Sequence, residues 1–159
     1  MSIQQQLDFM RRAIALATDN ALSGRGGPFG AVIVRDGHII AEAANSVTTA
    51  NDPTAHAEVA AIRLACNKLK AFSLKGCEIY TSCEPCPMCL AAIYWAHIGA
   101  IYYGNTSAEA ARADFNDANL YRELALPHDK RSIPSMQLLG DEAWASFDAW
   151  QNSAIKIEY

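Results

Sequence analysis

One nine-residue run constrains the fold of this chain most: TSCEPCPMC, residues 81–89. It holds three of the five cysteines of the chain, spaced three residues apart, together with two prolines. Cys86 and Cys89 have the spacing of a metal-binding pair, and a tetrahedral site needs further ligands from elsewhere in the chain. The segment HAE, residues 56–58, offers an imidazole and a carboxylate upstream. We therefore expect a fold that brings these two segments together.

The upstream segment is predicted to lie in the first turn of a helix. Asp52 is a typical helix cap and Pro53 a typical first helical residue, so a helix is expected over 53–69. In a helix interior, residues two apart point about 200° away from each other, which would separate His56 from Glu58. Near a helix N-terminus, both side chains can approach an ion that lies beyond the end of the helix.

The cysteine run is predicted to start a second helix. Pro87 at the first helical position makes Cys86 the cap and Cys89 the third residue, and this helix is expected over 87–96. Two helix N-termini that face one point favour thiolate over thiol, because each presents unpaired N–H groups and a positive dipole end. His56, Cys86 and Cys89 as ligands leave one tetrahedral position for water, which is the pattern of catalytic zinc.

Other interpretations of the cysteines stay open at this point. A Cys-x-x-Cys pair also occurs as a redox pair, but that interpretation gives the HAE segment no role, whereas zinc chemistry uses Glu58 as a proton shuttle beside the ion. A ferredoxin-type cluster requires a fourth cysteine where the chain has Ile93. Cys83 is an alternative fourth ligand of a structural zinc, although a core position is expected for it. Core packing is also expected for Cys66 and Cys77.

The remaining pattern predicts one α/β domain. Apolar residues recur at helical spacing over 3–22, and Asp36-Gly37 between two apolar runs is typical of a two-residue hairpin turn. Single strands that alternate with helices after this hairpin predict parallel crossovers. The expected strands are 29–34, 38–42, 78–81, 100–103 and a short fifth strand at 135–139, and the other expected helices lie around 107–113, around 117–124 and through Trp144, Phe147 and Trp150 to near Ile155.

The composition excludes several classes of function. The chain has 159 residues, of which 51% are apolar and 19% charged, and this predicts a globular domain with a core. Its net charge is −4 and it contains no basic run, which disfavours a nucleic-acid partner. No apolar run approaches the ~18 residues of a membrane span, and the first residues are not typical of a secretory signal. We therefore expect a cytoplasmic protein with reduced cysteines that acts on a small substrate.

The pairing of His-x-Glu with Pro-Cys-x-x-Cys resembles the signature of zinc-dependent nucleobase deaminases. In this chain it stands as HAE at 56–58 and PCPMC at 85–89. The chain is similar to members of the cytidine deaminase-like superfamily, and within it to the short bacterial guanine deaminases over almost its whole length. The resemblance implies a three-layer α/β/α fold with a mixed five-stranded sheet. It is carried by residues 27–32, 51–58, 80–89, 92–96, 115–117 and Tyr159.

The resemblance also implies an activity and the residues that perform it. It implies hydrolytic deamination of guanine to xanthine and ammonia with one Zn²⁺ per subunit, in which zinc-bound hydroxide attacks C2 and Glu58 is the catalytic proton shuttle. It further implies a homodimer that exchanges a C-terminal segment, about residues 115–159, between its subunits. The implied metal ligands are His56, Cys86 and Cys89, and the implied substrate-binding residues are Phe29, Asn45, Ala57, Trp95, Asp117 and Tyr159.

The side chains at these positions suit the recognition of a purine. Aromatic faces such as Phe29 and Trp95 stack on any base, so hydrogen bonds must supply the specificity. Asn45 can donate and accept at once, and Asp117 can accept from the N1–H and 2-amino groups of guanine. Without the resemblance, Trp95 is typical of a core aromatic, Asp117 of a loop cap and Tyr159 of a frayed chain end.

Rival interpretations remain at this stage. A tRNA adenosine deaminase of the same superfamily shares the zinc core, but it needs a basic surface that a net charge of −4 does not support. A deaminase of another aminated ring, such as a triazine, shares the whole mechanism. A non-catalytic binding module stabilised by zinc would use His56 and Glu58 for structure alone, and in such a protein Glu58→Gln would abolish no activity.

Overall fold

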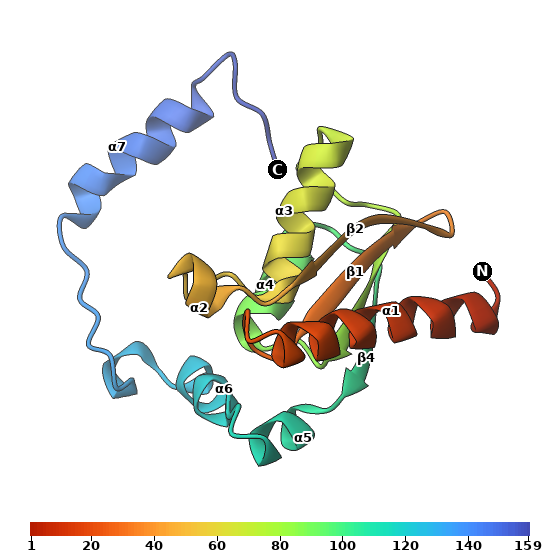
Figure 1. Ribbon diagram of the computed structural model, residues 1–159. Helices are drawn as coiled ribbons and strands as arrows, with labels where there is room; N and C mark the ends of the chain where they lie inside the picture. Colours follow the sequence, from red (N-terminus) through yellow and green to blue (C-terminus); the bar gives the residue numbers. More distant parts are fainter. The chain divides into compact units, whose positions relative to one another are not determined.

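Four strands form one mixed sheet in the order β2-β1-β3-β4 (Figure 1). They are β1 Gly30–Arg35, β2 His38–Ala44, β3 Cys77–Cys83 and β4 Ala100–Asn105. β1 pairs antiparallel with both β2 and β3, whereas β3 and β4 are parallel. The computed structural model describes residues 1–159. The predicted hairpin and the predicted parallel crossover behind it are both confirmed.

The hairpin turn has the conformation that its sequence predicts. Asp36 and Gly37 join β1 to β2 with φ angles of 51° and 75°. A two-residue type I′ turn requires positive φ at both central residues, which Asp-Gly provides at little cost. The turn therefore sets the register in which Arg35 lies opposite His38.

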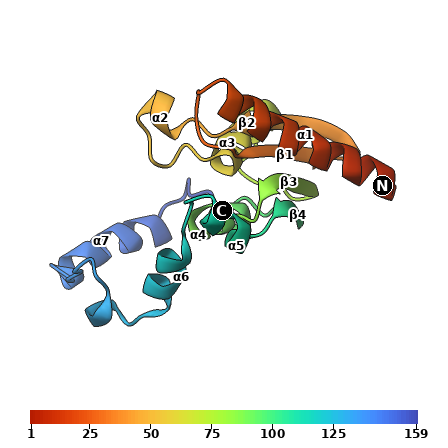
Figure 2. The same ribbon diagram turned by 60° about the horizontal axis from the view of Figure 1, so that its bottom comes forward.

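Helices cover both faces of the sheet. Helix α1, Ile3–Leu22, packs on the face that carries Val32 and Val34, and helices α3, Ala57–Leu69, and α4, Pro87–Trp95, pack on the face that carries Ala31 and Ile33. Successive side chains of a strand point to opposite faces, so these four residues of β1 serve two separate cores. In Figure 2, α1 and α4 lie on opposite sides of β3 and β4. The expected three-layer α/β/α arrangement is confirmed.

The start of α3 differs from the prediction. The helix begins at Ala57 with His56 as its N-cap, and not at Pro53. Asp52 forms a separate turn, because its Oδ1 accepts hydrogen bonds from the backbone N–H of Thr54 at 2.8 Å and from the Thr54 hydroxyl at 2.7 Å. A short helix, α2 Val47–Ala50, precedes this turn. The later start still leaves the HAE segment at a helix N-terminus.

The prediction of a fifth strand was wrong. Residues 135–139 have no regular structure, and the sheet has four strands. The alternation of apolar and polar residues in this segment is typical of a strand, but a strand also needs a neighbour whose backbone groups it can pair with. No other strand lies in the same part of the chain, which contains only helices.

The chain divides into two units, Met1–Ala118 and Asn119–Tyr159. The first unit holds the sheet, α1 to α4 and the short helix α5, Ser107–Arg112, and the second holds most of α6, Ala118–Ala125, then a 3₁₀ turn, His128–Lys130, and α7, Gly140–Gln151. No residue of the second unit is buried. None of the helices in either unit is long and apolar enough to span a membrane. The second unit exposes large apolar side chains that include Trp144, Phe147, Trp150, Ile155 and Ile157.

Candidate metal centre

Three side chains from two helix N-termini converge in the first unit. His56 Nδ1 lies 3.6 Å from Cys86 Sγ and 3.5 Å from Cys89 Sγ. All three ligand atoms lie within 4.8 Å of one another. Cys89 is fully buried, whereas His56 and Cys86 are partly buried. The structure thus brings together the three residues that the sequence predicts as metal ligands.

The spacing of these atoms fits a zinc ion. Zinc binds imidazole nitrogen at about 2.0–2.1 Å and thiolate sulfur at about 2.3 Å, and a tetrahedral angle between these bonds places nitrogen and sulfur roughly 3.5 Å apart. The two measured distances from His56 agree with this value. Three ligands of nitrogen and sulfur type leave one position open, as in catalytic zinc sites.

The two thiols also show why a cation belongs between them. The pKa of Cys86 is lowered to about 4, first because the Cys89 thiol donates a hydrogen bond to it and then because His56 does. The pKa of Cys89 is raised, mainly because it keeps the proton that it shares with Cys86 and also because it is buried. One proton therefore stabilises two adjacent sulfurs, and a divalent cation replaces that proton when both become thiolates.

The helix ends supply further positive potential. His56 is the N-cap of α3 and Cys86 the N-cap of α4, and Pro87 occupies the first helical position after Cys86. Neither helix has a conventional side-chain capping hydrogen bond. Both side chains are thus available as ligands, and the unpaired N–H groups of two helices face the centre.

Glu58 is an acid that interacts with all three residues of this centre. It is the second residue of α3 and only 7% exposed. Its pKa is raised, first of all by burial, and its surroundings include Cys86, His56 and Cys89. A buried carboxyl with a raised pKa beside an open coordination position can accept a proton from water and return it, as general acid–base catalysis requires.

Cys83 lies outside the metal centre, as the sequence predicts. It ends β3, is 7% exposed and directs its Sγ towards the backbone oxygen of Thr106 at 3.8 Å. Burial raises its pKa to about 11, so it stays a thiol. Cys77 is buried in the core at 1% exposure, and the partly buried Cys66 packs against the same core.

Phe29 and Asn45 lie next to each other, just before β1 and just after β2. The ring of Phe29 packs edge-on against Phe115, with their centroids 4.9 Å apart. Asn45, which is 8% exposed, follows β2 and accepts the backbone N–H groups of Gly27 and Val47 on its Oδ1, at 3.2 and 3.3 Å. The backbone N–H of Asn45 in turn donates to the carbonyl of Phe29 at 3.0 Å. The aromatic and the amide residue are therefore held as one group.

Asp117 approaches the centre from the loop after α5. It is partly buried, and its pKa is raised first by burial and then by the nearby negative charges of Cys86 and Glu84. Glu84 holds the start of this region, because its Oε2 accepts the N–H of Ser107 at 2.9 Å and its own N–H donates to the carbonyl of Asn105 at 2.8 Å.

The remaining predicted residues lie in different places. Ala57 is the fully buried first residue of α3, where a backbone N–H has no partner within the helix. Trp95 is the last residue of α4 and 68% exposed, about 12 Å along the helix axis from Pro87 at 1.5 Å per residue. Tyr159 ends the second unit and is 75% exposed.

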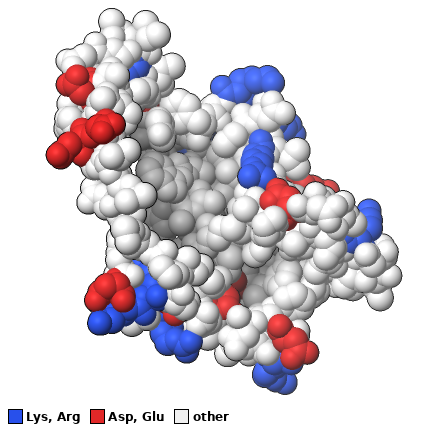
Figure 3. All heavy atoms as spheres, turned by 90° about the vertical axis from the view of Figure 1, so that its left-hand side faces the viewer, with Lys and Arg blue, Asp and Glu red and all other residues white.

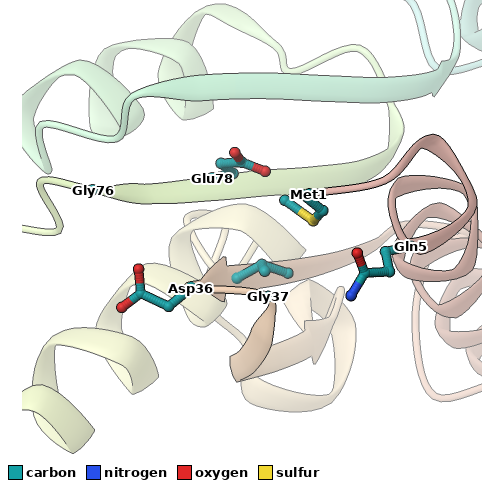
Figure 4. Close-up of a pocket in the computed structure, with 7 residues that line it drawn as sticks. Met1, Gln5, Asp36, Gly37, Gly76 and Glu78 are labelled. Atoms are coloured by element: carbon teal, nitrogen blue, oxygen red, sulfur yellow. The ribbon is translucent and has the colours of Figure 1, made fainter.

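A separate cavity of about 340 Å³ lies at the other end of the sheet (Figure 4). It opens between the start of α1, the β1–β2 turn and the start of β3, and none of the predicted site residues lines it. Its lining carries two acids and no ligand set for a metal. The lining residues are Met1, Gln5, Val34, Asp36, Gly37, Gly76 and Glu78.

The sequence pattern did not single out two residues that the structure shows to be important for local hydrogen bonding, Glu84 and Asn20. Glu84 lies inside the cysteine run, so its position alone could have drawn attention to it. Asn20 lies in α1 seven residues after the buried Ala13 and three after the buried Ala17, where an apolar residue is expected. A polar residue in a buried row of a helix indicates a specific hydrogen-bond partner.

Comparisons with known proteins agree with this site. The family described as the cytidine and deoxycytidylate deaminase zinc-binding region matches residues 3–105. A guanine deaminase from Bacillus subtilis is 54% identical over 151 residues, which are 95% of this chain and 97% of that protein. An X-ray structure of guanine deaminase from Bacillus subtilis superposes with a TM-score of 0.94 at 52% identity and covers 100% of this chain and 99% of that one. A tRNA-specific adenosine deaminase from Agrobacterium fabrum is 51% identical over 77 residues, which are 48% of this chain and 51% of that protein.

Proposed function

We propose that this chain, which belongs to the family of zinc-binding cytidine and deoxycytidylate deaminases, hydrolyses guanine to xanthine and ammonia. The observation that carries the reaction type is the buried Glu58 beside a three-ligand centre with one open position. The choice of base is supported by the similarity to a guanine deaminase, because it extends over 95% of the chain and so includes residues beyond the zinc-binding region.

The residues of the centre divide the chemistry between them. When His56, Cys86 and Cys89 hold zinc, the metal supplies a Lewis acid that makes water acidic near neutral pH. With the metal bound, Glu58 would take one proton from the water that adds to C2 of the purine and deliver it to the ring nitrogen. Glu58 would then take the second proton from the hydroxyl formed at C2 and deliver it to the amine, which leaves as ammonia as the C2 carbonyl forms. One carboxyl thus acts first as base and then as acid.

Recognition of the base is proposed to rest on the residues around Phe29. The Phe29–Phe115 pair offers an apolar wall against which a purine can pack. Asn45 uses its Oδ1 for two backbone N–H groups, which leaves its Nδ2 to donate to the base. The carboxylate of Asp117 can accept the N1–H and 2-amino groups of guanine, and adenine lacks this pair of donors.

The rival reaction on tRNA is less well supported. The sequence similarity to the tRNA-specific adenosine deaminase from Agrobacterium fabrum covers 48% of the chain, whereas the similarity to the guanine deaminase covers 95%. The face in Figure 3 shows Lys and Arg side chains singly or next to Asp and Glu, without a continuous basic patch. A protein that follows a phosphate backbone usually carries such a patch, and the net charge of −4 also disfavours nucleic acid, so we propose a free base as the substrate.

A panel of substrates tests the proposal. The purified zinc protein is incubated with guanine, adenine, cytosine and a tRNA anticodon arm, and the release of ammonia is followed. We expect turnover of guanine at the highest kcat/KM. Aminated triazines belong in the panel as side substrates. Turnover of the tRNA arm with no turnover of guanine would exclude the proposed function.

We also propose that the enzyme is a homodimer in which the unit Asn119–Tyr159 of one subunit packs on the other subunit. In support, this unit buries none of its residues, although it carries Trp144, Phe147 and Trp150. Apolar surface of this kind is normally covered by a partner. The five free cysteines suit a reducing compartment, and we propose the cytoplasm as the site of action.

Complementation between two defective subunits tests the exchange. One subunit carries Glu58→Gln and an intact C-terminal unit, and the other keeps Glu58 but lacks Tyr159. If the units are exchanged and Tyr159 completes the neighbouring site, each heterodimer has one intact site of two, so doubly tagged protein is expected to have about half of the wild-type activity. The measurement is guanine turnover by co-expressed, doubly tagged protein. Activity no higher than in either homodimer would contradict the exchange.

A further inference from the structure

Asn20 is a buried polar side chain of α1, and it faces the loop that leads to the site. It is only 3% exposed. Its Nδ2 donates two hydrogen bonds, to the carbonyl oxygen of Gly27 at 2.9 Å and to that of Asn45 at 2.8 Å. Both N–H groups of the amide are therefore used, and each joins Asn20 to a different segment of the chain.

These two segments carry the residues proposed to meet the base. Gly27 lies two residues before Phe29, and Asn45 lies directly after β2. The Oδ1 of Asn45 accepts the N–H of Gly27 at 3.2 Å and that of Val47 at 3.3 Å. With both lone pairs of Oδ1 engaged, the amide of Asn45 has one orientation, and its Nδ2 is the group left to meet a ligand. No buried side-chain nitrogen or oxygen of the protein lacks a partner, so this Nδ2 is not enclosed.

The backbone packs tightly around the Asn20 side chain. A Cβ atom on Gly26 would lie 2.3 Å from the carbonyl oxygen of Asn45 and 2.9 Å from Nδ2 of Asn20. Contacts below 3.0 Å do not occur for real Cβ atoms, so only glycine fits at position 26. The glycine loop thus wraps closely around the Asn20 amide, and a shift of that amide must move the loop.

We propose that Asn20 is a positioning residue for recognition of the base. From behind the site, its two hydrogen bonds fix the backbone at Gly27 and Asn45, and this aims the Asn45 amide at the substrate. Asn20 itself touches neither the substrate nor the metal ligands. This inference rests on one part of the proposed function: the enzyme must turn over a base, whichever base that is.

Two substitutions test the role of the amide. Asn20→Asp keeps the size but places carboxylate oxygens against two carbonyl oxygens, and Asn20→Ser removes the amide. A misplacement of about 1 Å at a site can cost up to roughly 10²-fold in rate, so we expect kcat/KM to fall about 10- to 100-fold in both variants, mainly through KM. Zinc content stays at the wild-type level, because Asn20 makes no contact with the ligands.

A control variant separates positioning from loss of stability. Leu74 is fully buried in the core between α3 and β3, at the end of the sheet away from the metal centre. Leu74→Ala is expected to lower the melting temperature at least as much as Asn20→Ser while kcat/KM, measured well below the transition, stays within about twofold of wild type. Equal losses of kcat/KM in Leu74→Ala and Asn20→Ser would overturn the proposal.

A double-mutant cycle gives the sharpest test. If Asn20 acts through the Asn45 amide, Asn20→Ser must lose most of its effect on kcat/KM in an Asn45→Ala background, and we expect a residual change below about threefold. An undiminished effect in that background would overturn the proposal, and so would failure of both Asn20 variants to fold, because the amide would then serve the whole fold. The cycle uses whichever base the wild type turns over, so lack of guanine turnover would reject the proposed function without deciding this one.

Discussion

Replacement of Glu58 with glutamine is expected to lower kcat by about 10²- to 10⁴-fold while zinc stays bound, because a general acid–base group contributes a factor of that size. Glutamine has the shape of the glutamate but cannot take a proton from water. Glu58 is not one of the three ligand residues, so the metal content measured by atomic emission should remain near one per subunit. Turnover is measured as ammonia released from guanine.

A second glutamate provides the matched control. Glu78 lies in β3, lines the cavity at the other end of the sheet and accepts a hydrogen bond from the Tyr80 hydroxyl at 2.9 Å. Glu78→Gln makes the same chemical change away from the centre, and kcat should stay within about twofold, as for substitutions outside functional features. Full turnover by Glu58→Gln with zinc in place would disprove the shuttle. Loss of zinc from that variant would show that Glu58 helps to hold the metal.

The metal ligands could be predicted because residue spacing and helix start signals, which identify them, are features of short sequence segments. Pro87 starts α4 where the sequence predicts it, so Cys86 and Cys89 occupy the cap and third positions. The start of α3 was wrong because the Asp52-Pro53 cap signal is satisfied by a turn, in which Asp52 bonds to Thr54. The prediction that His56 lies at a helix N-terminus did not depend on this error, because it required a nearby helix start and not a particular first residue.

Features that depend on distant partners could not be predicted in the same way. The segment 135–139 has the alternation of a strand but no neighbour with which to pair. The helical spacing of α1 places Asn20 on the buried side, yet nothing in the sequence shows that its partners are the carbonyls of Gly27 and Asn45. The joining of Phe29 to Phe115 likewise depends on how the loop after α5 returns to the sheet.

Loss of one metal ligand is expected to have the largest effect of all. Cys89→Ala removes a fully buried ligand, so zinc content and turnover should fall together. Zinc lowers the pKa of bound water to about 7, so without it hydroxide at neutral pH becomes scarcer by many orders of magnitude, and we expect kcat to fall by more than about 10⁴-fold. Cys66→Ser is the control, because it removes a thiol that is not in the centre and should keep both zinc and turnover.

The fold of the metal-free protein separates an enzyme from a zinc-stabilised binding module. A small module of that kind unfolds when its zinc is removed. Here the cores on both faces of the sheet are built from residues such as Ile33 and Val32, which are fully buried without any contribution from the metal. We therefore expect chelated protein to keep its far-ultraviolet circular dichroism and to melt in one transition at a lower temperature, since zinc binds only the native state. Re-addition of zinc should restore turnover and the melting temperature, whereas a chain that unfolds on chelation would be held together by its metal.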